Sequence, residues 1–266
     1  MRRTGERIAL TPTMGALHDG HIDLVRIARA KADRVVTSIF VNPKQFAPHE
    51  DFDRYPRALE ADVAKLAAEG VELVWAPSAE EMYAPGFATR VEVEGAARGL
   101  ETDFRPHFFG GVATVCTKLF SQVQPDFAVF GEKDYQQLCV IRQIVRDLDL
   151  PLEIVAAPTR READGLALSS RNAYLTAGER TIAPSLYLAL QTAADMVRSG
   201  AGIATSERSA AQAVRDAGFS KVDYIAIRDA TTLAEVSESS NGAAGPLRLL
   251  AAAWLGKTRL IDNLAV

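Results

Sequence analysis

The sequence predicts an α/β protein, with a Rossmann-like, doubly wound parallel sheet followed by a second, smaller α+β domain. Strand-like and helix-like runs alternate through the first 160 residues, and strands joined by helical crossovers form parallel sheets. Beyond this point, two alanine-rich helical stretches come first and three strand-like runs follow. We therefore predict two domains, residues 1–159 and residues 160–266.

The elements of the first domain follow one another in regular order. The run "RVVTSIFVN" is almost continuously apolar and β-branched, which is typical of a strand covered on both faces. Ile22 and Val25 recur at helical spacing, Gly70 stands at a helix cap position, and Pro125 ends a helix. The predicted strands are 7–11, 34–42, 71–77, 126–131 and 152–158, and the predicted helices are 21–32, 58–70, 111–125 and 137–150.

The second domain is predicted to contain two helices and three strands. The helices span 177–199 and 205–218, and the strands span 222–227, 247–255 and 258–263. The low-complexity stretch "SESSNGAAGP", residues 237–246, is predicted to be a surface loop. The tripeptide "GKT" at 256–258 resembles the end of a P-loop, but Ala251 stands where the first glycine is required. We interpret it as a β-turn.

Composition and charge exclude several classes of protein. The chain is 48% hydrophobic and 24% charged, which is enough apolar material for a core. A net charge of −4 gives no attraction to nucleic acid or to an anionic membrane, so neither partner is expected. The apolar runs 8–10 and 249–255 are too short for a signal peptide or a spanning helix. Cys116 and Cys139 lack CxxC spacing, so we expect a cytoplasmic protein without a disulfide framework.

Polar clusters follow the predicted strands. They are "TMGALHDGH" at 13–21, "NPKQF" at 42–46, "GEKDYQQ" at 131–137 and "GLALSSRN" at 165–172. Ligands of open parallel sheets bind at the carboxyl ends of the strands, so we expect these clusters to share one site. No GxGxxG is present, so a bound phosphate would need a different cradle.

The first cluster contains two of the four histidines of the chain. Gly15 permits a tight exit from the strand, and His18 and His21 would share one face of the first helical turn. Free backbone N–H groups and the positive end of the helix dipole there suit a phosphate. The alternatives are an exposed polar helix start or a zinc pair, for which no third ligand has suitable spacing.

The later clusters offer further hydrogen-bonding groups. Lys133 is a mobile ammonium, and Asp134 can accept hydrogen bonds from a ribose. The two serines and the arginine of "LSSRN" can bind phosphate oxygens through neutral and charge-assisted bonds. Each cluster alone is compatible with ordinary solvated surface or a turn, but together they favour a phosphate site.

Five linked motifs carry a resemblance to a known family. "PTMGALHDGH", "SIFVNPKQF", "FGEKDYQQL", "DGLALSSRNAYL" and "AAWLGKTRLIDN" resemble the pantothenate synthetase (pantoate–β-alanine ligase) family, in the right order over nearly the whole chain. The HxGH element and the "SSR" loop also resemble the signatures of the wider nucleotidyltransferase superfamily.

The resemblance implies a two-step ligation. ATP and pantoate would give pantoyl adenylate and pyrophosphate, and the amine of β-alanine would then attack the acyl carbon, releasing AMP and pantothenate. It also implies Mg²⁺ accompanying the ATP, a C-terminal lid domain that closes over the nucleotide, and a homodimer. Preorganised donors would stabilise the negative charge that spreads over the phosphoryl oxygens.

The resemblance also assigns roles to residues. His21 is implied as the proton donor, Gln45 and Gln137 as pantoate ligands, and Asn42 as a further substrate-binding residue. The implied catalytic set is His18, His21, Lys133, Ser169, Ser170 and Arg171. The implied ATP-binding set is Met14, Gly15, Leu17, His18, Gly20, His21, Gly131, Glu132, Lys133, Asp134, Arg160, Leu168, Ser169, Ser170 and Arg171.

Three positions call for separate interpretation. "HFFGGV" puts Phe108 where the family has histidine, with His107 one place early. Arg160 is expected to contact ATP through its backbone. Asp62 is a candidate magnesium ligand, with an exposed helical carboxylate as the alternative.

Rival functions make different demands on the sequence. A simple nucleotidylyltransferase would share HxGH but would not need the paired glutamines. An aminoacyl-tRNA synthetase is disfavoured because the chain has no anticodon domain and is acidic. A non-catalytic nucleotide-binding module is disfavoured because Lys133 and the "SSR" loop are intact.

Overall fold

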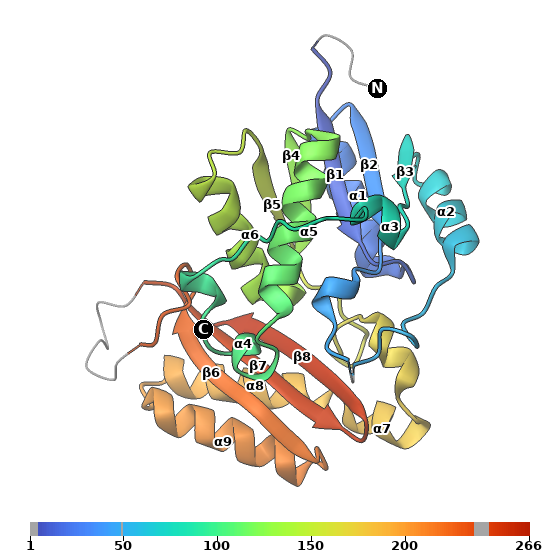
Figure 1. Ribbon diagram of the computed structural model, residues 1–266. Coiled ribbons are helices and arrows are strands. Elements are labelled where there is room, and N and C mark those ends of the chain that lie inside the picture. The colour runs from blue at the N-terminus through green and yellow to red at the C-terminus, as the bar shows by residue number, and fades with distance from the viewer. Residues whose placement is uncertain (1–4, 49, 237–244) are drawn as a thin grey trace.

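The computed structural model describes residues 5–48, 50–236 and 245–266, and its first part is a five-stranded parallel sheet. The strands run in the order β3-β2-β1-β4-β5 (Figure 1). Their bounds are β1 Ile8–Thr13, β2 Arg34–Ile39, β3 Leu73–Trp75, β4 Phe127–Gly131 and β5 Glu153–Ala157. The predicted Rossmann-like, doubly wound fold class is confirmed.

Helices cover both faces of this sheet and give it two apolar layers. The first layer joins the sheet to α5 and α6 through buried residues such as Leu10, Val112 and Leu138. The second joins it to α1 and α2 through residues such as Val25 and Leu66. The helix bounds are α1 Asp19–Lys31, α2 Leu59–Ala68, α3 Ala79–Met82, α4 Glu101–Phe104, α5 Phe108–Val123 and α6 Tyr135–Asp147. The continuous β-branched run of β2 is therefore buried on both sides, as its sequence predicts.

The C-terminal part is a three-stranded antiparallel sheet in the order β6-β7-β8, with two long helices packed on it. Its elements are α7 Ala177–Ile182, α8 Ser185–Arg198, α9 Ile203–Asp216, β6 Lys221–Asp229, β7 Leu247–Leu255 and β8 Thr258–Ala265. The tripeptide at 256–258 lies at the turn between β7 and β8, as predicted: residues 256 and 257 form the turn, and Thr258 begins β8. The predicted loop 237–246 lies outside the described residues except for its last two.

One predicted helix is wrong in its continuity. We expected a single helix over 177–199, but α7 ends at Ile182 and α8 begins at Ser185. Pro184 lies between them as the N-cap of α8. Because proline has no backbone N–H and its ring clashes with the preceding turn, the helix is interrupted there.

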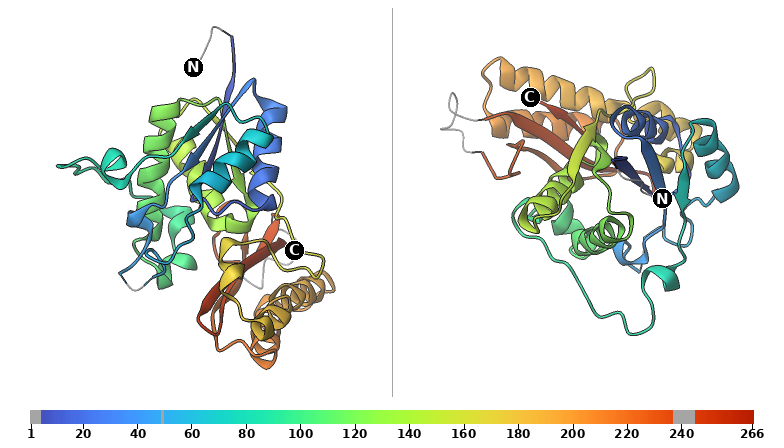
Figure 2. Two further views of the ribbon diagram at one scale, coloured as in Figure 1. Left: turned by 90° about the vertical axis from the view of Figure 1, so that its right-hand side faces the viewer. Right: turned by 90° about the horizontal axis from the view of Figure 1, so that it is seen from above.

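The sheet order determines where a ligand can bind. It reverses between β1 and β4, which are neighbours in the sheet although β2 and β3 lie between them in the sequence. The segments that follow these two strands are "TMGALHDGH" and "GEKD", and such a switch point is where open α/β sheets bind ligands. The C-terminal sheet lies across this edge (Figures 1 and 2).

We propose that the domains divide between residues 159 and 160, in the connection that follows β5. Pro158, Thr159 and Arg160 in this connection line the cavity between the two sheets. Small 3₁₀ helices complete the chain at η1 Pro43–Gln45, η2 Gly95–Ala97, η3 Glu132–Asp134 and η4 Ser170–Tyr174. Among the described residues, the helices lack the length and apolar character needed to cross a membrane.

Candidate functional site

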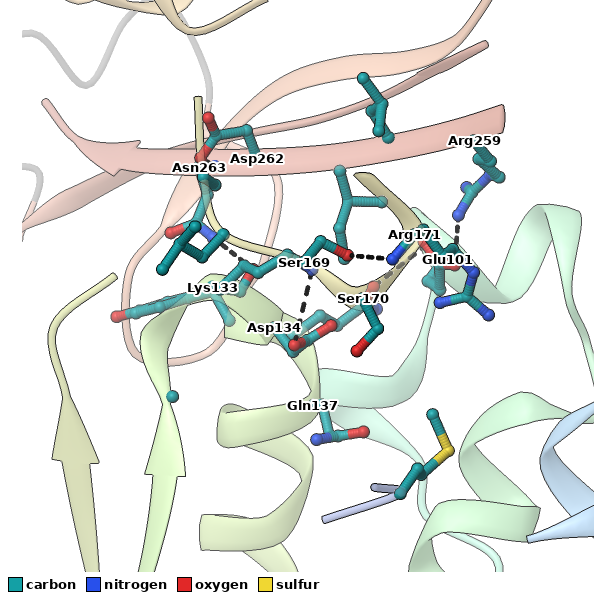
Figure 3. A pocket seen from close by; sticks show the side chains of 18 of the residues that line it. Glu101, Lys133, Asp134, Gln137, Ser169, Ser170, Arg171, Arg259, Asp262 and Asn263 are labelled. Carbon is teal, nitrogen blue, oxygen red and sulfur yellow. Dashed lines mark hydrogen bonds and ion pairs between the residues drawn. The ribbon is translucent and has the colours of Figure 1, made fainter. Parts of the chain in front are cut away.

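A cavity of about 560 Å³ lies between the parallel sheet and the C-terminal sheet and is lined by both (Figure 3). It gathers most of the predicted site residues from five separate segments of the chain. Those that line it are Met14, His18, Gly20, His21, Gln45, Gly131, Lys133, Asp134, Gln137, Arg160, Leu168, Ser169, Ser170 and Arg171. The four polar clusters of the sequence thus meet in one cleft.

The two histidines stand at the start of α1 and face each other. His18 is the N-cap residue and His21 is the third residue of the helix, and their ring centroids are 4.1 Å apart. The backbone N–H of His18 donates to Nδ1 of His21 at 3.3 Å. Because Nδ1 of a neutral imidazole accepts only when the proton is on Nε2, His21 presents Nε2–H as its free donor.

The surroundings lower the pKa of both imidazoles and so favour their neutral forms. Burial, followed by the charges of His18 and Lys133, lowers the pKa of His21 to about 3. Burial and Lys133 also lower the pKa of His18. The pair therefore offers hydrogen bonds without bringing a net charge of its own.

Lys133 and Asp134 lie in η3, immediately after β4. The ammonium of Lys133 is 3.8 Å from the carboxylate of Asp134. Asn263 of β8 donates from Nδ2 to the backbone carbonyls of Glu132 at 2.9 Å and Lys133 at 2.8 Å. The C-terminal sheet therefore holds the turn that presents the lysine.

The "SSR" segment forms η4 and reaches across to the N-terminal domain. Ser169 caps η4 by accepting from the backbone N–H of Arg171 at 3.3 Å. The hydroxyl of Ser170 donates to the carbonyl of Ala16 at 3.4 Å. Arg171 forms two hydrogen bonds of 3.0 Å with Asp51. This segment is thus already docked beside the helix start that carries the histidines.

Gln45 ends η1, the short 3₁₀ helix after β2, and is 8% exposed. Its Oε1 accepts from Nδ2 of Asn42 at 2.8 Å. With its oxygen engaged, the amide nitrogen of Gln45 is the group left to bind a ligand. Gln137, the second predicted pantoate ligand, lies on α6 and borders the same space (Figure 3).

Four of the residues predicted to bind ATP or substrate do not line the cavity, and their binding roles stay predictions. Asn42 is 1% exposed and lies behind Gln45, with its Oδ1 accepting from the hydroxyl of Tyr83. Glu132 turns its carboxylate to Arg248. Gly15 and Leu17 support the loop from within: Gly15 has φ +84°, and Leu17 is buried in the core.

Asp62 is the anchor of the loop after β1, and the expectation of an exposed carboxylate is wrong. It is 1% exposed and accepts from the backbone N–H groups of Ala16 and Leu17, both at 2.8 Å. A buried carboxylate is stable only with such partners. The interaction spans more than forty residues of sequence, so no local pattern could have predicted it.

Arg160 and His107 have different positions relative to the cavity. Arg160 borders it, and its carbonyl accepts from the N–H of Leu168 at 2.9 Å, while its guanidinium pairs with Asp23. His107 is the N-cap residue of α5 and is absent from the lining, which Phe108 joins instead. The guanidinium of Arg105 stacks over the ring of Phe108 at 4.0 Å.

Sequence reasoning missed several residues of the cavity. The most connected are Asp51, Tyr55, Glu101, Arg105, Tyr224 and Arg259. They lie in the loop before α2, around α4 and on the C-terminal sheet, away from the carboxyl ends of the parallel strands. The "LGKTRLIDN" motif could have pointed to β8, but nothing in it singles out Arg259.

The candidate metal ligands around the cavity are mostly bonded to other groups of the protein. The described residues contain no group of three His, Cys, Asp or Glu side chains able to hold an ion. Asp51 and Glu50 are paired with arginines, and both Asp62 oxygens are engaged. Asp134, whose side chain is 45% exposed, is the lining carboxylate with a free face.

Comparison with known proteins identifies relatives over the full length. Residues 1–265 match the family model described as pantoate-beta-alanine ligase. A pantothenate synthetase of Caulobacter vibrioides is 58% identical over 265 residues, covering 100% of this chain and 93% of the relative. One of Rhodopseudomonas palustris is 55% identical over 267 residues, again covering 100% and 93%.

Solved structures agree with the fold. The crystal structure of pantothenate synthetase from Thermus thermophilus matches with a TM-score of 0.91 and 50% identity, covering 97% of this chain and 93% of that one. A pantoate-beta-alanine ligase from Francisella tularensis, complexed with beta-gamma ATP and beta-alanine, matches with a TM-score of 0.82 and 34% identity, covering 99% and 91%. This chain therefore belongs to the pantoate-beta-alanine ligase family.

Proposed function

We propose that this protein condenses pantoate with β-alanine at the expense of ATP, through a pantoyl-adenylate intermediate, and so makes pantothenate. The observation that carries the proposal is one cavity lined both by phosphate-binding donors and by two glutamine amides. A nucleotide alone would not require the glutamines, whereas a small hydroxy acid needs both donors and acceptors.

In the first step, a carboxylate oxygen of pantoate attacks the α-phosphorus of ATP, and the bond to the pyrophosphate breaks. Negative charge spreads over the phosphoryl oxygens and the departing pyrophosphate. Lys133, the Nε2–H of His21 and the "SSR" segment (Ser169, Ser170 and Arg171) supply preorganised donors for that charge. No nucleophile of the protein is needed.

In the second step, the amine of β-alanine attacks the acyl carbon of the adenylate and AMP leaves. Gln45 and Gln137 hold the pantoyl group in both steps. Holding adenylate and amine together gives an entropic advantage and keeps water away from the mixed anhydride.

His21 acts as a neutral hydrogen-bond donor in this scheme. A histidine with a pKa of about 3 holds no second proton at neutral pH. Its Nε2–H can still bind a phosphoryl oxygen, and the approach of a triphosphate would raise its pKa because an anion favours the imidazolium.

Magnesium enters the proposal as a companion of the triphosphate. Mg²⁺ keeps several waters and binds through phosphate oxygens with one or two carboxylates, so it does not need a cage of protein ligands. The lining residues do not form such a cage, and no step here relies on the ion. We also propose a cytoplasmic homodimer, as the family resemblance implies.

Product analysis tests the function directly. With ATP, pantoate and β-alanine we expect AMP, pyrophosphate and pantothenate in equal amounts, and we expect ATP–pyrophosphate exchange that requires pantoate. Formation of ADP would overturn the adenylate mechanism. Exchange that proceeds equally without pantoate would instead indicate a simple nucleotidylyltransferase.

A further inference from the structure

Glu101 lies at the junction of the two domains and is bonded from both. It is the first residue of α4, and its side chain is only 7% exposed. From the C-terminal sheet, Nη1 of Arg259 donates to Oε1 at 2.5 Å (Figure 3). The hydroxyl of Tyr224 donates to Oε2 at 3.2 Å. From its own domain, Nη1 of Arg105 donates to Oε1 at 3.2 Å.

Arg105 extends this contact to the segment that carries Gln45. Its Nη2 donates to the backbone carbonyl of Gln45 at 3.0 Å. Its Nε and Nη2 also bind both carboxylate oxygens of Glu50, at 2.8 and 2.7 Å. The charged side chains in these contacts are at most 17% exposed; they are Glu50, Glu101, Arg105 and Arg259. A continuous polar path thus runs from β8 through Glu101 and Arg105 to Gln45.

The backbone before Glu101 is held in an uncommon conformation. Leu100, the N-cap of α4, has φ +53° although it is not glycine, and it is 4% exposed. Such a conformation costs energy and persists only where the surroundings enforce it. Here the turn directs the carboxylate of Glu101 toward the C-terminal sheet.

We propose that Glu101 and Arg105 are positioning residues. They link the packing of the C-terminal sheet against the N-terminal domain (the seated sheet) to the placement of Gln45, so that nucleotide and pantoate bind cooperatively. The proposal rests on the proposed function, in which Gln45 binds pantoate. A nucleotide in the cavity contacts both domains and so favours the seated sheet. The seated sheet brings Arg259 and Tyr224 to Glu101, which completes the path to Gln45.

The burial of the path makes it sensitive to the loss of one member. A buried charge without its partner is strongly unfavourable, so removal of Arg259 leaves Glu101 under-satisfied and free to draw Arg105 away from Gln45. Arg259 is itself held by Asp223, which accepts from its Nε at 2.7 Å. The position of Gln45 would then no longer depend on the position of the sheet.

The test is the effect of nucleotide on pantoate affinity, measured by calorimetry. Pantoate is titrated into the protein with and without α,β-methylene-ATP, whose α,β bond cannot break. For the wild type we expect at least about fivefold tighter pantoate binding with the analogue, and an equal effect of pantoate on the analogue because coupling is reciprocal. We define the coupling ratio as the Kd for pantoate without the analogue divided by the Kd with it. In Arg259→Met we expect this ratio to fall to near one, and Arg259→Lys should restore part of it.

Two phenylalanine variants give a matched comparison. Tyr224→Phe removes one inter-domain hydroxyl from Glu101, and we expect it to reduce the ratio. Tyr135→Phe removes another inter-domain hydroxyl, which donates to the carbonyl of Ala230 at 2.9 Å and has no link to Gln45. It should keep the wild-type ratio. Each variant loses only one oxygen, so both should fold.

The outcomes separate this proposal from the proposed function. Three outcomes would overturn the positioning role while AMP formation still supported the ligase. They are a wild-type ratio of one, a wild-type ratio in Arg259→Met, and an equal reduction of the ratio in the two phenylalanine variants. Failure of the wild type to bind pantoate or to form AMP would overturn both.

Discussion

Arg171 and Asp51 are joined by two hydrogen bonds of 3.0 Å, from Nε to Oδ2 and from Nη2 to Oδ1. The pair connects the "SSR" segment to the loop before α2, and the two side chains are only 29% and 14% exposed. Arg171 is a proposed phosphate ligand, so the carboxylate of Asp51 already binds the guanidinium N–H groups that a phosphate would bind. ATP must therefore compete with Asp51.

This competition predicts that Asp51→Asn binds ATP more tightly. The amide removes a negative charge near the triphosphate and releases Arg171, so we expect the Kd for ATP to fall about three- to tenfold, or about 0.6–1.4 kcal/mol. Calorimetric titration with α,β-methylene-ATP measures it. Asp195→Asn, in an exposed pair with Arg198, is the control and should change nothing. Weaker binding in Asp51→Asn would show that Asp51 supports the site instead.

The depressed pKa of His21 predicts a pH-dependent stability. In the unfolded chain His21 binds a proton near pH 6.5, but in the folded protein its pKa is about 3. Between these values the unfolded state holds more protons, so the free energy of unfolding falls as the pH falls from 6.5 toward 3. Above pH 6.5 this loss is absent.

Urea unfolding at pH 7.5 and pH 5.5 tests this effect. We expect the wild type to lose about 1.4 kcal/mol more than His21→Gln over this interval, which corresponds to one pH unit below the unfolded pKa. Comparing the two proteins cancels the titration of other groups. An identical loss in both proteins would mean that the pKa of His21 is the same in the folded and the unfolded state.

Asn42 is predicted to affect pantoate without touching it. Its Nδ2 donates to Oε1 of Gln45 and to the carbonyl of Gly111. Asn42→Ala should free the Gln45 amide to rotate, and we expect the KM for pantoate to rise about tenfold, equivalent to one hydrogen bond of about 1.4 kcal/mol. The KM for ATP should change little. Gln45→Ala should have a larger effect in steady-state kinetics, and the reverse order would contradict the assignment.

The parts of the site that could be predicted from sequence depend on local rules. His18 and His21 are three residues apart at a strand-to-helix junction, and helical geometry alone brings them together. The sheet order could not be derived in this way, but its parallel character could, because strands and helices alternate. Pro184 is a local signal that the predicted helix 177–199 overlooked, since proline interrupts a helix interior.

The parts that could not be predicted depend on contacts between distant segments. Asp62 has its partners more than forty residues away, and Glu101 meets Arg259 across 158 residues. A charged side chain on a helix is usually exposed, so burial of Asp62 ran against the general expectation. The position of Asn42 has a related explanation: its neighbour Gln45 lines the cavity and Asn42 does not, and only packing decides which of the two amides does so.

Close packing behind Gln45 gives a last prediction. Gly111 of α5 lies so near η1 that an added Cβ would stand 2.2 Å from the backbone carbonyl oxygen of Lys44 and 3.0 Å from the N of Gln45. Because backbone atoms cannot move aside as a side-chain tip can, Gly111→Ala must push η1 outward. We expect it to lower the free energy of unfolding by about 1–3 kcal/mol and to raise the KM for pantoate. Gly178→Ala is the matched control, since its Cβ would meet nothing within 4 Å in α7 and alanine favours a helix by up to about 1 kcal/mol. Urea unfolding and pantoate kinetics on both variants test the prediction, and a Gly111→Ala protein with wild-type stability and KM would mean that η1 yields without moving Gln45.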